Sequence, residues 1–161
     1  MPKSRKEIYL SKITNPFLYF FFMLWRLPSL VFWGVKLQTL SDEKCITRIK
    51  QRWTNQNPFN SIYFSALNGT AELSTGLLFQ LHLQQFEKYS MLVVESKAQF
   101  KKKARGKIKV TCNDGNEIMK NISEMKNPND HFTLTVTSTA IDEQNTEVGL
   151  FEFTWSVKRI T

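Results

Sequence analysis

The stretch from Ser61 to Gln85 carries the longest helical pattern in the chain. Its apolar positions recur at the spacing of a helix, and small residues occupy many of the positions between them. These small residues are Ser65, Ala66, Gly69, Ala71, Ser74 and Gly76. Because small side chains let other parts of a protein approach a helix closely, the sequence predicts a long helix that is buried on most sides.

One carboxylate, Glu72, lies in the middle of this predicted helix. Burying a carboxylate is costly unless it is paired or protonated, so its presence needs an explanation. Burial should raise the pKa of Glu72, and a raised pKa suits a general base that works near neutral pH. The alternative is a structural carboxylate, satisfied by a helix-end amide or by a lysine of a second copy of the chain.

Segments with the alternation of β-strands flank this helix in the sequence. Two precede it and four follow it: Val31–Leu40, Lys44–Trp53, Met91–Lys103, Lys107–Cys112, His131–Ile141 and Glu147–Ile160. In the third of these strands, the even-numbered residues from Leu92 to Phe100 are expected to face the core. The segment Glu117–Lys126 fits either a short helix or a long connection.

Six antiparallel strands and one buried helix leave few compact arrangements, because a sheet that buries such a helix must curl around it. The expected fold class is therefore α+β, with a curled antiparallel sheet, one long central helix and an additional N-terminal helix. A chain of 161 residues is long enough to bury a core and has room for one domain of ordinary size, which we expect to span residues 1–161.

The most hydrophobic stretch, Pro16–Trp33, has the composition of a membrane anchor but not the length. A spanning helix needs about 20 apolar residues, whereas Arg26 interrupts this run and Pro28 follows it. We expect residues 1–27 to form an N-terminal helical segment that ends near Leu27. Its basic residues Lys3, Arg5, Lys6 and Lys12 allow contact with a membrane surface, but no transmembrane span is expected.

Cysteine and histidine are scarce, which limits the possible chemistry. Cys45 and Cys112 are too few for a disulfide scaffold or a four-cysteine zinc site, and they suit a reducing cytoplasm. His82 and His131 are the only histidines and are far apart in the sequence. The sequence therefore predicts no metal site and no resident cofactor.

A loop before the long helix adds a second candidate residue. Asn57 lies in the segment Asn57-Pro58-Phe59-Asn60-Ser61, fifteen residues before Glu72.

In this order of elements, and in this spacing, the chain resembles the hot-dog-fold acyl-CoA thioesterase superfamily. It is most similar to small, single-domain bacterial thioesterase-like proteins. Phenylacetyl-CoA-type members carry an Asn in this loop, a His-Gly-Gly step and an Asp within the helix. Here Tyr63-Phe64-Ser65 replaces His-Gly-Gly, and Glu72 takes the place of the Asp.

The resemblance implies hydrolysis of an acyl-CoA thioester, with Glu72 as general base or direct nucleophile. Asn57, or Asn60, would hold the water or the thioester, and Asn68 has the i,i+4 spacing to hydrogen-bond Glu72. The start of the helix would polarise the carbonyl through its free amides, and the residues in question are Ser61, Tyr63, Phe64 and Ser65. The resemblance also implies a homodimer, or a dimer of such dimers, in which Glu72 of one copy faces the loop of the other.

Charge is unevenly distributed along the chain, whose net charge is +8. Up to Asn113 there are eighteen basic and six acidic residues, and from Asp114 onward there are four basic and eight acidic. Seven of the positive charges fall between Lys97 and Lys109. The phosphates of the CoA moiety, which enters only as part of the substrate, are expected to bind five of them: Lys101, Lys102, Lys103, Arg105 and Lys107.

Several alternatives stay open at this level. The basic run is also typical of a solvated surface, and Asn57 is also typical of a turn residue before proline. A non-catalytic acyl-CoA or lipid-binding protein of the same fold would explain the missing His-Gly-Gly step. Nucleic-acid binding is the remote alternative, because only one aromatic residue, Phe100, is interleaved with the basic run, whereas single-strand binders use several.

Overall fold

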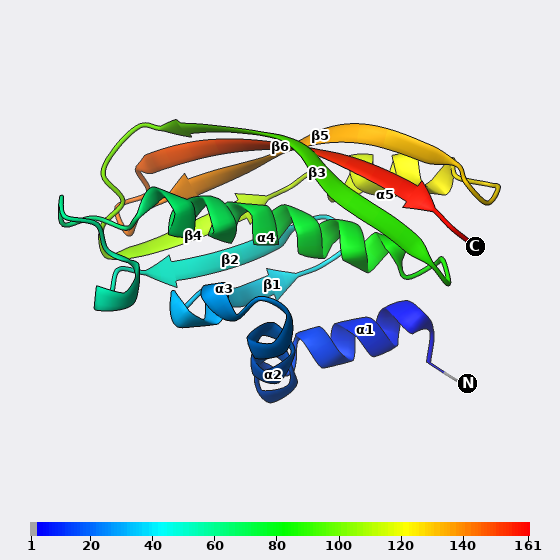
Figure 1. Cartoon of the computed structure of the whole chain (residues 1–161), viewed down its shortest axis with the longest axis horizontal. Helices are drawn as coiled ribbons and strands as arrows, with labels where there is room; N and C mark the ends of the chain where they lie inside the picture. Colours follow the sequence, from blue (N-terminus) through cyan, green and yellow to red (C-terminus); the bar gives the residue numbers. More distant parts are fainter. Residues whose placement is uncertain (1–2) are drawn as a thin grey trace.

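Helix α4 (Phe64–Leu83) lies against one face of a six-stranded antiparallel sheet that curls around it (Figure 1). The structure is a computed structural model and describes residues 3–161. The order of strands across the sheet is β1-β2-β4-β5-β6-β3. Their bounds are β1 (Lys36–Leu40), β2 (Cys45–Lys50), β3 (Tyr89–Phe100), β4 (Lys107–Cys112), β5 (His131–Ile141) and β6 (Glu147–Arg159). This arrangement confirms the α+β, hot-dog type of fold with a central helix.

Helix α4 is buried along most of its length, as its small residues predict. Ala66, Ala71, Ser74 and Gly76 are all buried, and the sheet packs directly on this part of the helix. Three strands each bond to α4 with one buried side chain. These bonds run from Thr47 Oγ1 to the carbonyl of Thr70 (2.9 Å), between the hydroxyls of Ser74 and Ser138 (2.7 Å), and from Trp155 Nε1 to Thr75 Oγ1 (3.0 Å). The helix is therefore fixed both along and about its axis.

Three of the four strands that follow α4 have nearly the predicted bounds, whereas β3 runs from Tyr89 to Phe100 instead of from Met91 to Lys103. Strands β4 and β5 begin and end at the predicted residues, and β6 ends one residue earlier than expected. Strand β2 is shorter than predicted, because a one-turn 3₁₀ helix (Trp53–Asn55) replaces its last residues. The side chain of Asn55 stabilises that turn, since its amide nitrogen donates to the carbonyls of Trp33 and Lys50, both at 2.8 Å.

The prediction of a strand over Val31–Leu40 is wrong in its first half. Pro28–Phe32 forms a short helix, α3, and β1 begins only at Lys36. Proline suits the first turn of a helix, where its missing N–H leaves no hydrogen bond unmade. The chain then turns at Gly34, whose φ of +75° is accessible to glycine, and enters the sheet.

Two helices, not one, form the N-terminal segment. They are α1 (Arg5–Ile13), with a capping box between Ser4 and Glu7, and α2 (Pro16–Arg26), whose first amides are capped by Asn15. Helix α2 ends at Arg26, next to the predicted end near Leu27. Among the described residues, no helix is both long and apolar enough to cross a membrane.

The predicted inner face of β3 is wrong over its first half. Leu92 and Val94 are 63% and 53% exposed, and Met91 and Val93 pack on the core in their place. The cause is a bulge between Val93 and Glu95, which shifts the alternation by one residue. Beyond the bulge, Ala98 packs on the core as predicted.

Residues Gly115–Ser123 form helix α5, so the alternative of a long connection over 117–126 is excluded. Gly115 opens this helix against the β1–β2 turn, and its amide donates to the carbonyl of Glu43 at 3.0 Å. A side chain at this position would overlap the backbone of Asp42 and Glu43. Glycine is therefore required by the close approach of two backbones.

We expect Gly115→Ala to lower the free energy of unfolding by about 3 kcal/mol, because the new methyl group must push two backbone segments apart. Urea unfolding followed by circular dichroism measures the change. Asn116→Ala, at the next and exposed position of α5, is the matched control and should change the free energy by less than about 0.5 kcal/mol. Equal effects of the two substitutions would contradict the close approach.

Candidate functional site

Glu72 is the only acidic residue of α4, and it lies at the edge of a cavity of about 430 Å³. Residues from α2, β3 and β6 line this cavity with it, among them Phe22, Arg26, Tyr89, Met91 and Trp155. The lining is mainly apolar. Within residues 3–161, nothing donates a hydrogen bond to the carboxylate of Glu72 and no cation pairs with it. Of the structural alternative, the helix-end amide therefore has no counterpart among the described residues, and the lysine of a second copy stays a prediction.

Burial raises the pKa of Glu72 to about 7. Desolvation is the only cause, since low-polarity surroundings disfavour the charged form. At neutral pH the carboxylate and the neutral acid are thus both populated. A group in this state can accept a proton in one step of a reaction and return it in a later one.

Gly76, one turn after Glu72, leaves space for the carboxylate because it has no side chain. A Cβ on Gly76 would lie 3.4 Å from Oε1 of Glu72 and 3.4 Å from the ring of Trp155, so the carboxylate and the indole meet over this glycine. The indole is held in place by its hydrogen bond to Thr75, whose hydroxyl donates to the carbonyl of Glu72 at 2.8 Å. The wall beside the carboxylate is therefore rigid.

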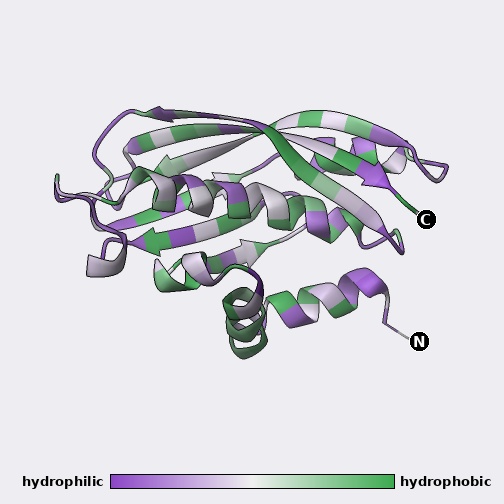
Figure 2. Ribbon diagram, in the orientation of Figure 1, coloured by the Kyte–Doolittle hydropathy of each residue, from purple (hydrophilic) through white to green (hydrophobic). Residues whose placement is uncertain are grey.

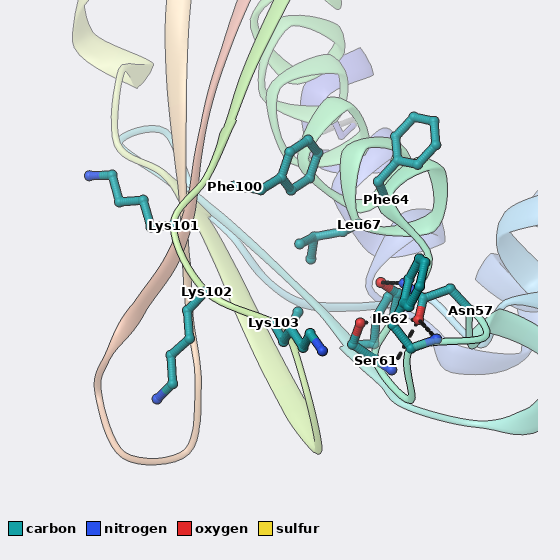
Figure 3. Close-up of a pocket in the computed structure, with 11 residues that line it drawn as sticks. Asn57, Ser61, Ile62, Phe64, Leu67, Phe100, Lys101, Lys102 and Lys103 are labelled. Atoms are coloured by element: carbon teal, nitrogen blue, oxygen red, sulfur yellow. Dashed lines mark hydrogen bonds between the residues drawn. The ribbon is translucent and has the colours of Figure 1, made fainter.

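A second cavity, of about 350 Å³, lies at the start of α4 (Figure 3). It is lined by Asn57, Phe59, Ser61, Ile62, Phe64, Leu67, Phe100, Lys101, Lys102, Lys103 and Ala104. Tyr63 is the N-cap residue of α4, and its side chain makes no capping hydrogen bond. The amides of Phe64 and Ser65 have no acceptor among the described residues. They are free to bind an anion or a polarised carbonyl oxygen.

Asn57 holds the loop that leads to these amides. Its Oδ1 accepts from the amide of Phe59 (3.0 Å) and from both the amide and the hydroxyl of Ser61 (3.2 Å each). Its Nδ2 points to the carbonyl of Ile62 at 3.5 Å. The side chain is thus occupied by its own loop, which favours a positioning role over direct contact with substrate.

Asn60 and Asn68, the supporting candidates, take no part in a polar network with Glu72. Asn60 occupies the left-handed region, with φ of 57°, and its Oδ1 accepts from Gln51 at 3.1 Å. No hydrogen bond joins Asn68 to Glu72 among the described residues, despite the i,i+4 spacing. Asn60 is therefore a turn residue in this structure.

The basic run is partly neutralised by the acidic C-terminal part of the chain. Four of its members form ion pairs: Lys97 with Glu152 (3.3 Å), Lys101 with Glu147 (2.6 Å), Lys102 with Asp142 (3.3 Å) and Lys107 with Glu143 (3.2 Å). In Figure 3, Lys101 and Lys102 extend away from Phe64, whereas Lys103 points toward Ser61. Lys103 and Arg105 have no acidic partner in the described part of the chain, and Arg105 Nε donates to the carbonyl of Asn60 at 3.0 Å.

The predicted site residues therefore fall into two groups. Asn57, Ser61, Phe64 and the lysines 101–103 gather at the start of α4, while Glu72 lies two turns further along the helix. Lys107 lines neither of these two cavities but a separate one. At about 1.5 Å per residue, Phe64 and Glu72 are about 12 Å apart along the axis. One chain does not place its own Glu72 beside its own free amides.

The sequence did not point to three residues that shape the surroundings of Glu72. Trp155 and Phe22 come from segments far apart in the sequence, and no local pattern marks either of them as a neighbour of Glu72. Gly76 could have been found from the sequence, because a residue four positions after Glu72 lies next to it on a helix, and a glycine there leaves space beside the carboxylate.

Comparisons with known proteins agree with the fold. Residues 22–157 match the model of a family described as a domain of unknown function, DUF4442. A Pseudomonas aeruginosa protein of unknown function, described as a probable thioesterase, is 19% identical, with a TM-score of 0.72 over 99% of this chain and 98% of its own. A Chlorobaculum tepidum protein of unknown function is 11% identical, with a TM-score of 0.76 over 97% of both chains.

A thioesterase from Haemophilus influenzae is also similar, at 10% identity and a TM-score of 0.63, over 99% of this chain and 94% of its own. No curated protein sequence matches the chain. At these identities the likeness to solved structures establishes the fold.

The raised pKa of Glu72 makes a prediction about stability. Between about pH 4.5 and 7 the folded protein keeps a proton on Glu72 that the unfolded chain has lost, so the free energy of unfolding falls as pH rises through this window. Glu72→Gln is neutral at every pH. It should match the wild-type Tm at pH 4 and exceed it by about 7 to 14 °C at pH 8, in thermal unfolding followed by circular dichroism.

Glu124→Gln is the control, because Glu124 is exposed at the end of α5. Its Tm difference from the wild type should stay near zero at both pH values. A Glu72→Gln difference that does not vary with pH would mean that the carboxylate titrates as it does in water.

Proposed function

This chain belongs to the DUF4442 family, and we propose that it is a thioesterase that hydrolyses an acyl-CoA. The observation that carries the proposal is Glu72, a carboxylate in a mainly apolar cavity, without a partner among residues 3–161 and with its pKa raised to about 7. The likeness in fold to a Pseudomonas aeruginosa protein described as a probable thioesterase, and to a Haemophilus influenzae protein described as a thioesterase, supports it.

Glu72 acts as the general base in this proposal. It takes a proton from a water molecule, and the water oxygen attacks the carbonyl carbon of the thioester. The carbonyl oxygen becomes an oxyanion, which the amides of Phe64 and Ser65 and the positive end of the α4 dipole stabilise. The C–S bond then breaks, the thiolate takes the proton from Glu72, and a carboxylic acid is released. Direct attack by Glu72, with later hydrolysis of the anhydride by water, is the alternative route.

The proposal requires two copies of the chain, because Glu72 and the free amides of one copy lie too far apart to act on one carbonyl. Strand β3 offers the place for the second copy. It is an edge strand of twelve residues, and Leu92 and Val94 are exposed on it. A long edge strand with apolar side chains is a template for pairing with another strand. We propose a homodimer in which the β3 edges pair and Glu72 of one copy meets the α4 start of the other.

The phosphates of CoA bind near Lys103 and Arg105 in this proposal. These two cations have no acidic partner in the described chain and lie beside the cavity at the start of α4. Lys101, Lys102 and Lys107 would first have to leave Glu147, Asp142 and Glu143. These three contribute less, because a phosphate must then replace an existing ion pair rather than add one.

We expect Glu72→Ala to lower kcat by about 10²- to 10⁴-fold on the best substrate of an acyl-CoA panel, because the general base is removed. The wild-type rate should rise with pH and reach a plateau above about 7, as Glu72 loses its proton. Release of free CoA thiol, measured with a thiol-reactive chromophore, reports the rate. Glu124→Ala, at the exposed end of α5, is the matched control and should keep full activity.

Two results would overturn catalysis by Glu72: no turnover of any acyl-CoA, or full activity in Glu72→Ala. The occupied side chain of Asn57 and the Tyr63-Phe64-Ser65 step favour one alternative, a protein that binds acyl-CoA without hydrolysing it. Such a protein would show no turnover but would gain thermal stability from CoA. This gain would fall with added salt and in Lys103→Ala.

We expect Leu92→Lys combined with Val94→Lys to convert the dimer into a monomer, because charges would then face each other across the paired β3 edges. Light scattering coupled to size-exclusion chromatography measures the mass, and activity should fall with it. Met119→Lys is the control, since Met119 is also an exposed apolar residue, 46% exposed on α5. A monomeric wild type with full activity would contradict the two-copy site.

A further inference from the structure

Helix α2 exposes more apolar surface than any other helix among the described residues. Seven of its eleven residues are large, apolar and exposed: Phe17, Leu18, Phe20, Phe21, Phe22, Leu24 and Trp25. Phe17 is 70% and Trp25 83% exposed, while Met23 is the one buried residue of the helix. Figure 2 shows much of α2 in the hydrophobic colour. An apolar patch of this kind marks an interaction site rather than an ordinary surface.

The helix lies apart from the sheet, at the N-terminal side of the molecule (Figure 1). It is eleven residues long and is bounded by Asn15 and by the Arg26–Pro28 step, so it is about half the length of a membrane span. Its phenylalanines and Trp25 are the residue types that bury shallowly in the boundary between lipid headgroups and acyl chains. A helix of this length and composition suits the plane of a membrane surface.

Unpaired cations lie next to α2. A cavity of about 230 Å³ between the α1–α2 link and β1 is lined by Pro16 and Tyr19 on one side and by Lys36 and Arg48 on the other. In the sheet, Lys36 is opposite Arg48, and Arg48 is opposite Lys109. We call Lys36, Arg48 and Lys109 the basic row. Its members share one face of the sheet, and within residues 3–161 none of them has an acidic partner.

Like charges directly opposite each other on a sheet are destabilising, so the basic row suits an external anion. Lys12 and Arg26, on α1 and α2, add two exposed cations without an acidic partner in the described chain. Apolar side chains on a helix, next to a row of cations, are the two components by which a protein binds an anionic bilayer.

We propose that α2 and the basic row dock this protein on the surface of an anionic lipid bilayer. Helix α2 lies in the plane of the interface with its aromatic side chains among the acyl chains, and the basic row faces the phosphate headgroups. A second copy of the chain is the less suitable occupant of this face. A symmetric contact through α2 would bring the basic row of one copy near that of the other, and like charges would oppose it.

Sedimentation of the full-length protein with lipid vesicles tests the proposal. The wild type should bind vesicles of phosphatidylcholine that contain about 30% phosphatidylglycerol at least about tenfold more tightly than vesicles of phosphatidylcholine alone, because its cations then face charged headgroups. High salt should remove most of this preference. Trp25→Ser should weaken binding about tenfold or more, because one large aromatic side chain no longer enters the interface.

Trp53→Ser is the matched control, because Trp53 is 80% exposed but lies in the 3₁₀ helix after β2. It should bind vesicles as the wild type does. Lys36→Glu with Arg48→Glu should abolish the preference for anionic vesicles, whereas Lys120→Glu, on exposed α5, should keep it. The tryptophan emission should shift to the blue on binding, and Trp25→Phe should remove this shift while retaining binding.

The proposal is overturned if the wild type does not sediment with anionic vesicles, or if Trp25→Ser binds them as tightly as Trp53→Ser does. It is also overturned if Trp25→Ser lowers the mass measured by light scattering without changing vesicle binding, since α2 would then contact a second copy. These outcomes do not depend on thioester hydrolysis, which the Glu72 variants test separately.

Discussion

Burial of α4 is the constraint on which the rest of this structure depends. A sheet can pack closely around a helix only where the side chains of the helix are small, and Ala66, Ala71 and Gly76 are such residues. Three buried side-chain hydrogen bonds, from β2, β5 and β6, then fix the helix relative to the sheet. Because nearly every other position of α4 is apolar or small, Glu72 stands out as the one carboxylate of this helix, and nothing in the described residues compensates its charge.

The same burial explains what a single carboxylate gains from this position. In water a glutamate is ionised at neutral pH and is a weak base. Beside Trp155 and Gly76, burial raises the pKa of Glu72 to about 7. At neutral pH a carboxylate with this pKa is a stronger base than a glutamate in water, and a large fraction of it is still deprotonated. A carboxylate of this kind destabilises the folded state. The presence of Glu72 in a helix that is otherwise apolar or small is therefore better explained by a chemical role than by a contribution to stability.

Local pattern predicted much of the fold. Helix α4 and strands β4 and β5 follow periodicity closely, because each has one continuous face on the core. The first half of β3 could not be predicted in this way. A bulge leaves no mark in a run such as Met91-Leu92-Val93-Val94, where apolar residues occupy both faces. Only pairing with β6 decides which of them faces inward.

The site shows a similar limit. The fifteen-residue spacing of Asn57 and Glu72 pointed to the loop before α4 and to the middle of that helix, but the hydrogen bonds of Asn57 with Ser61 are visible only in the folded loop. The basic run looked unopposed in the sequence, because its acidic partners on β6 and the β5–β6 turn lie 36 to 55 residues away. Pairing across that distance reduces the cations available to a phosphate chiefly to Lys103 and Arg105.

Helix α2 connects the two proposals physically. Phe22 lines the cavity of Glu72, and it also lines an apolar cavity of about 260 Å³ between α1 and α2, together with Ile13 and Leu18. One side of α2 is thus a wall of the proposed reaction site, while its other sides are the face proposed to lie in the bilayer. Because the two cavities share Phe22, under both proposals an apolar route along α2 would join the membrane surface to the cavity of Glu72. Under both proposals together, the substrates are thioesters whose acyl chains partition into membranes, because for these the apolar route costs less than passage through water.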